Sequence, residues 1–159
     1  MSVPANQMPA MLQSQQNARN FPAVPGGTDP YFARDFFTYE ADITATIAAS
    51  GATTYTLQIQ TDSDFLWTKA SFIQTGTGVP AILIQDNGSG RNLSTFAVPV
   101  SNIFGTGQLP FILPRQRIFQ ANASVTLNIS EIGGTNTITS LHLSFIGEKG
   151  FKYSQYQGG

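Results

Sequence analysis

Ser124-Val-Thr-Leu-Asn-Ile-Ser130 and Thr137-Ile-Thr-Ser-Leu-His-Leu-Ser-Phe-Ile146 are the two stretches of this sequence that decide its fold. In the first, aliphatic side chains alternate with hydroxyl and amide side chains, a period of two that predicts a strand with one dry face. In the second, Leu141 begins the same alternation against serine and histidine. Because Gly133-Gly134 separates the two strands, we expect a hairpin or a Greek-key corner in a sheet that packs on a second layer.

Strand patterns also cover much of the chain before these two stretches. Alternation from Phe37 to Ile47 predicts the longest strand, and the turn Ser50-Gly51 predicts a hairpin with the strand that follows. Asp86-Asn-Gly-Ser-Gly90 contains an Asn-Gly pair, which is a strong hairpin signal, and Pro99 marks the returning strand as an edge. The other stretches with a strand pattern are 55–60, 65–74, 81–85 and 92–99.

Eight strand candidates at short spacing, with no helical period among them, predict an all-β protein. We expect a two-sheet sandwich with jelly-roll topology. Composition divides the chain into three parts: an extended N-terminal arm at 1–35, rich in Gln, Asn, Pro and Gly, the β-sandwich domain at 36–150, and a C-terminal tail at 151–159.

Charged residues are unusually few in this sequence. Only 17 of the 159 residues are Asp, Glu, Lys or Arg, and the net charge is -1. Such a chain offers neither the basic stripe that binds nucleic acid nor a polybasic membrane patch, so we expect neither partner. A surface with so little charge repulsion is best suited to contact with other protein.

The chain contains no cysteine, which removes disulfides, thiolate metal sites and cysteine nucleophiles together. The sequence has no charged segment followed by an apolar h-region and no apolar run long enough to span a bilayer, so we expect no secretion leader and synthesis in a reducing cytosol.

Residues that carry catalytic chemistry are few. His142 is the single histidine, and we interpret it as a surface or sheet-packing residue because its neighbours alternate as a strand. No Gly-x-Ser-x-Gly elbow is present to hold the nucleophile of a triad. The carboxylate pairs Glu40 with Asp42, and Asp62 with Asp64, are interpreted as solvated face and turn residues. Asp62-Ser-Asp64 also lacks the downstream ligands of a calcium loop. We therefore expect no enzymatic activity, no catalytic residue, no cofactor and no metal.

Aromatic side chains leave one alternative open. Trp67, Tyr39 and Tyr55 would form the platform of a carbohydrate-binding module if they shared an exposed face. Their alternation with polar residues favours a core face. Recognition or assembly remains as the expected kind of function.

Three segments carry a resemblance to a known group of proteins: Leu109-Pro-Phe-Ile-Leu-Pro114, Arg117-Ile-Phe-Gln-Ala-Asn122 and Leu141-His-Leu-Ser-Phe-Ile-Gly-Glu-Lys-Gly-Phe151. In these segments the chain resembles small auxiliary virion proteins of tailed bacteriophages. The resemblance covers about the last third in detail and the rest in composition.

The resemblance implies a structural virion protein that decorates or cements a phage capsid by bridging neighbouring subunits, or a minor head protein. A neck or tail component is a close variant. The implied partners are the chain itself as a homo-oligomer, with a trimer expected, and the major capsid protein or another virion protein. The implied location is the virion, after synthesis in the host cytoplasm.

Aromatic residues at both ends of the domain are the expected interface anchors under this resemblance. The alternative from a different class is a glycan-binding jelly-roll module of a tail or fibre, with Trp67 as its binding residue. The expected anchors are Phe21, Tyr31, Phe32, Phe36, Phe37, Phe151, Tyr153 and Tyr156.

Overall fold

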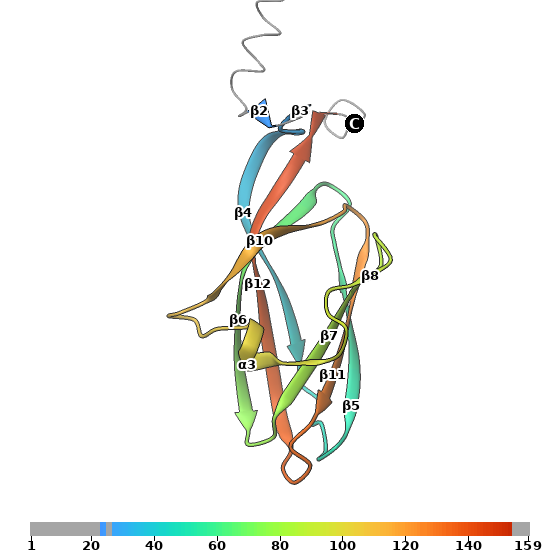
Figure 1. Ribbon diagram of the computed structural model, residues 1–159, viewed down its shortest axis with the longest axis vertical. Helices are drawn as coiled ribbons and strands as arrows, with labels where there is room; N and C mark the ends of the chain where they lie inside the picture. The colour runs from blue at the N-terminus through green and yellow to red at the C-terminus, as the bar shows by residue number, and fades with distance from the viewer. Residues whose placement is uncertain (1–22, 25–26, 154–159) are drawn as a thin grey trace, which may run out of the picture. The chain divides into compact units, whose positions relative to one another are not determined.

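The computed structural model describes residues 23–24 and 27–153. The regular elements of the described residues are strands, with one short helix. The elements are β2 (Ala23–Val24), β3 (Gly27–Thr28), β4 (Tyr31–Ile43), β5 (Ala52–Gln58), β6 (Asp64–Gly76), β7 (Pro80–Asp86), β8 (Arg91–Asn92), β9 (Val98–Pro99), α3 (Val100–Ile103), β10 (Phe111–Phe119), β11 (Ser124–Glu131) and β12 (Ile138–Lys152) (Figure 1).

The chain divides into two compact units, residues 34–150 and residues 1–33 with 151–159. In the second unit, β2 and β3 form a short antiparallel pair. Most of the predicted arm, residues 1–22, lies outside the described residues.

Residues 34–150 contain two antiparallel sheets packed face to face, which confirms the predicted all-β sandwich (Figure 1). The strand order of the first sheet is β10-β6-β12-β4. The second has the order β5-β11-β7-β8, and β9 also pairs with β7. The edge strands of the first sheet are therefore β10 and β4.

Most consecutive strands lie in opposite sheets, which corrects the hairpin predicted at Ser50-Gly51 and excludes the hairpin alternative at Gly133-Gly134. β4 and β5 do not pair, and neither do β11 and β12, because each connection crosses from one sheet to the other. Alternation shows which side chains of a strand are dry, but it does not show which strand lies beside it. The hairpin predicted at Asp86 is confirmed, because Gln85 pairs with Asn92 and Asp86 pairs with Arg91.

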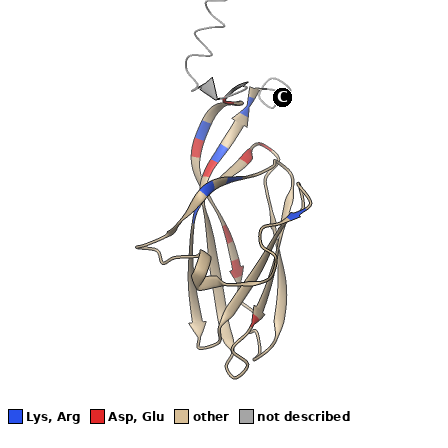
Figure 2. Ribbon diagram, in the orientation of Figure 1, with Lys and Arg blue, Asp and Glu red and all other residues tan. Residues whose placement is uncertain are grey.

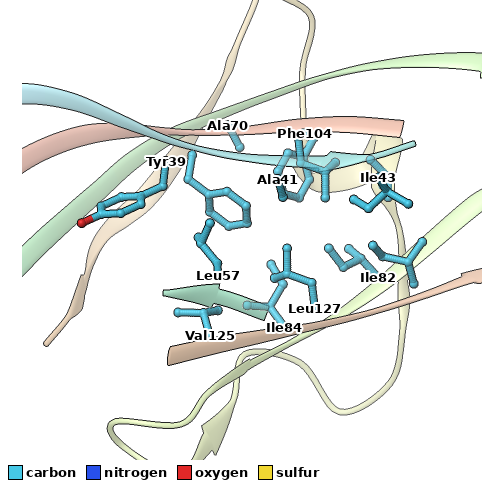
Figure 3. Packing of buried hydrophobic residues seen from close by; sticks show 14 of the residues in the cluster. Tyr39, Ala41, Ile43, Leu57, Ala70, Ile82, Ile84, Phe104, Val125 and Leu127 are labelled. Atoms are coloured by element: carbon cyan, nitrogen blue, oxygen red, sulfur yellow. The ribbon is translucent and has the colours of Figure 1, made fainter. Parts of the chain in front are cut away.

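The core lies between the sheets and is built by the predicted dry faces. Val125, Leu127 and Ile129 of β11 are buried, and so are the alternate residues of β12 that begin at Leu141. Figure 3 shows Val125, Leu127 and Ile84 facing side chains from the opposite sheet.

An irregularity in β10 shapes one side of the sandwich. Phe111 and Ile112 pair with Ala70 and Lys69 of β6, but the register shifts before Arg117, which pairs with Trp67. The residues between them bulge from the sheet at Pro114, which lacks the N–H that ladder pairing needs. Proline is tolerated there because β10 is an edge strand.

Candidate functional site

The predicted aromatic anchors at the two ends of the chain contact one another. The ring of Phe32 lies 6.5 Å from that of Phe151 and 5.4 Å from that of Tyr153, between centroids. Tyr31 is buried, whereas Tyr153 is exposed. Phe21 and Tyr156, also predicted as anchors, lie outside the described residues.

Phe36 and Phe37 are adjacent in sequence but differ in environment. The side chain of Phe36 is 75% exposed on β4. Phe37 packs edge-on against Tyr39, with 4.9 Å between ring centroids, and the Lys149 Nζ lies 4.4 Å from its ring centre. Phe36 is therefore available to a partner, and Phe37 stabilises the fold of its own chain.

The aromatic residues considered for a carbohydrate platform belong mostly to the core, as their alternation predicts. Trp67 is only 4% exposed, and its ring stacks on Phe119 at 5.8 Å between centroids. Its indole N–H donates to the backbone carbonyl of Lys69. Tyr39 is also buried, while Tyr55 is partly buried against the core. The burial of Trp67 therefore excludes the alternative in which this residue belongs to an exposed carbohydrate-binding platform.

His142 gathers the predicted polar residues of β4 and β12 into one exposed cluster. Its Nε2 lies 2.7 Å from Glu40 Oε1, and its Nδ1 lies 3.4 Å from Asp42 Oδ1. Ser144 donates its hydroxyl hydrogen to the same Glu40 oxygen. Because this hydroxyl faces a carboxylate rather than the imidazole, the cluster does not activate Ser144 as a nucleophile.

His142 and Glu40 shift each other's pKa towards the charged forms. The hydrogen bond between them raises the pKa of His142 above the ordinary value of 6.5, although partial burial acts to lower it. Partial burial acts to raise the pKa of Glu40, but hydrogen bonds from Ser144 and His142 outweigh it, so this pKa is lowered from 4.5. The pair is therefore most strongly charged, and most attractive, at mildly acidic pH.

Asp62 and Asp64 have separate structural partners. Asp62 Oδ2 lies 2.9 Å from Lys149 Nζ, and Asp64 Oδ1 accepts the backbone N–H of Ala121 at 2.9 Å. Partial burial raises the pKa of Asp62, but the hydrogen bond from Lys149 outweighs it and the net pKa is lowered. Each carboxylate is therefore held by a contact with another part of the folded chain, Asp62 by Lys149 and Asp64 by the backbone of Ala121.

Glu131 is a polar residue that sequence reasoning missed. Its buried carboxylate accepts four backbone N–H groups, from Ser50, Val79, Gly133 and Gly134, at 2.8–2.9 Å. These hydrogen bonds, led by that of Val79, lower its pKa to about 2. Because the donors come from three different connections, Glu131 joins the loops at one end of the sandwich.

Residues 34–150 contain a groove between the two sheets. It has a volume of about 630 Å³ and lies between β10, the residues at β8 and helix α3. The bulge at Pro114 forms one wall. Its apolar lining consists of Trp67, Ile84, Leu93, Ile103, Phe111, Leu113 and Pro114, and its cationic lining consists of Arg91, Arg115 and Arg117.

The three arginines differ in their partners. Arg117 Nη2 donates to buried Asp86 Oδ2 at 2.8 Å and to Ser89 Oγ at 3.0 Å, while its Nε is buried without a hydrogen-bond partner in the structure. Arg91 and Arg115 form no ion pair with any described residue. Figure 2 marks the basic residues of β10 and of the β7–β8 turn in blue, and three arginines beside one apolar groove that no Asp or Glu lines form a cationic site.

Sequence reasoning also missed this groove. Arg115 and Arg117 are close in sequence, but Arg91 reaches them through the β7–β8 turn, and part of the apolar lining comes from β6, β7 and α3. The one local signal was Pro114 between two apolar residues and two arginines, which marks an irregular edge strand.

No helix within 23–24 and 27–153 is long and apolar enough to cross a membrane. In the same ranges, no group of three or more His, Cys, Asp or Glu side chains is arranged to hold a metal ion.

No protein-family model and no curated protein matches the chain. VP2 of infectious bursal disease virus, in a subviral particle, is 18% identical to it, with a TM-score of 0.39 over 86% of this chain and 39% of that chain. The Drosophila NLP core is 9% identical, with a TM-score of 0.32 over 76% and 99% of the two chains. PorU of Porphyromonas gingivalis is 13% identical, with a TM-score of 0.33 over 80% and 14%. The chain thus spans about two fifths of the VP2 chain that it matches, and similarities this low carry no functional argument.

Proposed function

We propose that this protein is a structural component of a virus particle, which decorates or cements a tailed-phage capsid by bridging neighbouring subunits. It acts by burying its surface against other proteins and catalyses no reaction. The proposal places it in the virion as a homo-oligomer, with a trimer expected, in contact with the major capsid protein or another virion protein.

The observation that carries the proposal is a set of large apolar side chains exposed on a surface with little charge. Each member is at least 68% exposed, although single exposed apolar residues on ordinary domains need no explanation. Depletion of charge together with exposed aliphatic and aromatic side chains is typical of protein interfaces. The set consists of Phe36, Ile73, Phe96, Leu109 and Ile112.

Part of this set lies on one side of the first sheet. Ile73 and Ile112 lie on the neighbouring strands β6 and β10. Leu109 belongs to the connection between α3 and β10, which projects from the sandwich (Figure 1). A projecting loop with an 80% exposed leucine is suited to insertion between subunits of a partner.

The strand order supports a jelly-roll topology as part of the proposal. When β8 and β9 are counted as one strand, the first sheet contains strands six, three, eight and one of the chain, and the second contains two, seven, four and five. This interleaving of early and late strands is expected of eight strands wound as two Greek keys.

The test uses particles assembled from the genome that encodes this chain, with and without an intact reading frame for it. We expect mass spectrometry of purified particles to detect the chain in fixed proportion to the capsid subunit. Particles without it should lose their DNA at lower temperature, because the bridging contacts are missing. Absence of the chain from purified particles would refute the proposal, and recovery with isolated tails would favour the neck or tail variant.

A further inference from the structure

Strand β5 is an edge of the second sheet, and one of its sides is open (Figure 1). Of the described strands, β11 alone pairs with it. Just beyond its ends, the Glu131 N–H donates to the Gly51 carbonyl at 2.8 Å, and the Ile59 N–H donates to the Ala123 carbonyl at 2.9 Å. Because the backbone groups of a strand alternate in direction, the odd-numbered residues of β5 point theirs towards β11. The residues that point their N–H and C=O groups to the open side are Ala52, Thr54, Thr56 and Gln58.

The other edges of the two sheets are protected against pairing. β10 is interrupted at Pro114 and carries two arginines, β4 carries four charged residues, and β8 and β9 are only two residues long. Charges, prolines, bulges and short strands are the features that keep a sheet edge from pairing with another chain. β5 has none of them, because Ala-Thr-Thr-Tyr-Thr-Leu-Gln contains no charge and no proline and its register with β11 is unbroken.

The edge of β5 is complementary to a second copy of itself. A two-fold axis at Tyr55, the middle residue of the strand, pairs β5 antiparallel over its whole length and places Thr54 opposite Thr56 of the second copy. Both residues point their backbone groups to the open side, so the pair exchanges both N–H···O bonds. Opposed threonines stabilise a sheet. With no charge on β5 and a net charge of -1 on the chain, electrostatic repulsion between copies is small.

The side chain of Tyr55 gives this pairing an apolar contact. Its ring is half-buried and packs against the core of its own sandwich. On the two-fold axis it lies opposite Tyr55 of the second copy in a non-hydrogen-bonded pair, the type in which side chains approach most closely. The two rings therefore cover each other's exposed surface, and aromatic cross-strand pairs stabilise a sheet.

We infer that β5 of one copy pairs antiparallel with β5 of a second copy, which makes the second sheets of the two copies one continuous sheet. A two-fold contact does not build a trimer, so it links a subunit of one trimer to a subunit of the next. The inference rests on the assembly role proposed above and identifies a contact that bridges neighbouring oligomers.

Cysteine cross-linking of the full-length chain tests the pairing, because the sequence contains no cysteine of its own. Cα atoms of a non-hydrogen-bonded antiparallel pair are about 4.5 Å apart, within the range that a disulfide spans. We expect oxidised Tyr55→Cys to form a covalent dimer. Thr53→Cys is the matched control on the same face of β5. Its two copies should not cross-link, because Thr53 lies opposite Leu57 in this register.

A mixture of two variants tests the register with Tyr55 in place. Thr54 and Thr56 are both exposed, and they lie opposite each other only between copies, with Cα atoms about 5.5 Å apart. Thr54→Cys mixed with Thr56→Cys should therefore form a covalent dimer that contains one copy of each. Each variant alone should cross-link much less.

A proline substitution tests the hydrogen bonds of the open side. Thr56→Pro removes an N–H that points away from β11, and proline is tolerated at such a position of an edge strand. Because both copies lose a hydrogen bond, self-association should weaken at least roughly 10-fold in sedimentation velocity and native mass spectrometry. Thr56→Val keeps the N–H and should associate nearly as strongly as the wild type. Thermal unfolding should verify that each variant is folded.

Three outcomes overturn the inference. They are wild-type protein that stays monomeric at every accessible concentration, cross-linking of Tyr55→Cys no greater than that of Thr53→Cys, and undiminished association of folded Thr56→Pro. Particle binding is measured separately on wild-type protein. Dimers that depend on β5 but do not bind particles would refute only the virion proposal, and particle binding without β5 pairing would refute only this inference.

Discussion

The Nε2 atom of His142 lies 2.7 Å from Oε1 of Glu40, although 101 residues separate them in the chain and they lie on different strands, β12 and β4. Both side chains are about two-fifths exposed, at 42% and 39%. The contact therefore links the edge strand β4 to its neighbour β12 by charge as well as by backbone pairing.

This pair predicts a pH-dependent contribution to stability. The pKa of His142 is raised, so its contribution is full below about pH 6.5 and is lost as the pH rises through the folded-state pKa. The pKa of Glu40 is lowered, so its contribution is present above about pH 4.5 and is lost as the pH falls through the folded-state pKa. His142→Gln should therefore cost most between about pH 5 and 6.5, by about 0.3–1 kcal/mol because the pair is solvent-screened. Urea unfolding of both proteins from pH 4 to 9 measures this, and a constant difference across that range would contradict it.

The lowered pKa of Glu131 predicts a second pH dependence of stability, at more acidic pH than that of His142 and Glu40. Its pKa of about 2 lies below the ordinary 4.5, so its contribution is present above pH 4.5 and declines as the pH falls towards 2. Glu131→Gln replaces one acceptor oxygen by an NH₂ group that cannot accept the backbone N–H groups, and the melting temperature at pH 7 should fall by roughly 5–10 °C. Glu148→Gln is the control, at a half-exposed carboxylate whose ion pair with Arg34 lies at the surface. Equal melting temperatures for Glu131→Gln and the wild type would show that the loops do not depend on this carboxylate.

Arg117 predicts a strong coupling with Asp86. Arg117→Met leaves the buried Asp86 carboxylate without its cation and should lower the free energy of unfolding by about 2 kcal/mol. Adding Asp86→Asn removes the unpaired charge, so the double variant should lose less than the sum of the two single losses. A double-mutant cycle by denaturant unfolding measures the coupling, and additive losses would refute it.

Because Trp67 is buried in the core, we expect its replacement to lower stability rather than to remove a binding function. Trp67→Ala should lower the free energy of unfolding by about 3–5 kcal/mol, because the ring packs among Phe104, Phe119 and Phe145. Near-UV circular dichroism and urea unfolding measure the change. Full stability of this variant would contradict the core placement, and glycan binding lost only through unfolding would not support a carbohydrate site.

Local sequence determined the strands, their dry faces and one turn. The alternation around Leu127 and Leu143 specified which side chains are buried, because successive side chains of a strand point to opposite faces. The Asn87-Gly88 pair specified the β7–β8 hairpin, because the turn is made by adjacent residues. These features depend only on neighbours along the chain.

Tertiary structure alone decided the strand order, the loop junction at Glu131, the pairing of His142 with Glu40, and the groove that contains Arg91 and Arg115. A dry strand face packs equally well in either sheet, so local alternation left the hairpins and crossings undetermined. Likewise, an exposed arginine or a buried glutamate acquires its role from residues tens of positions away. Those contacts exist only after the two sheets have packed, which is why the sequence by itself specified the layers of this protein and not the sites between them.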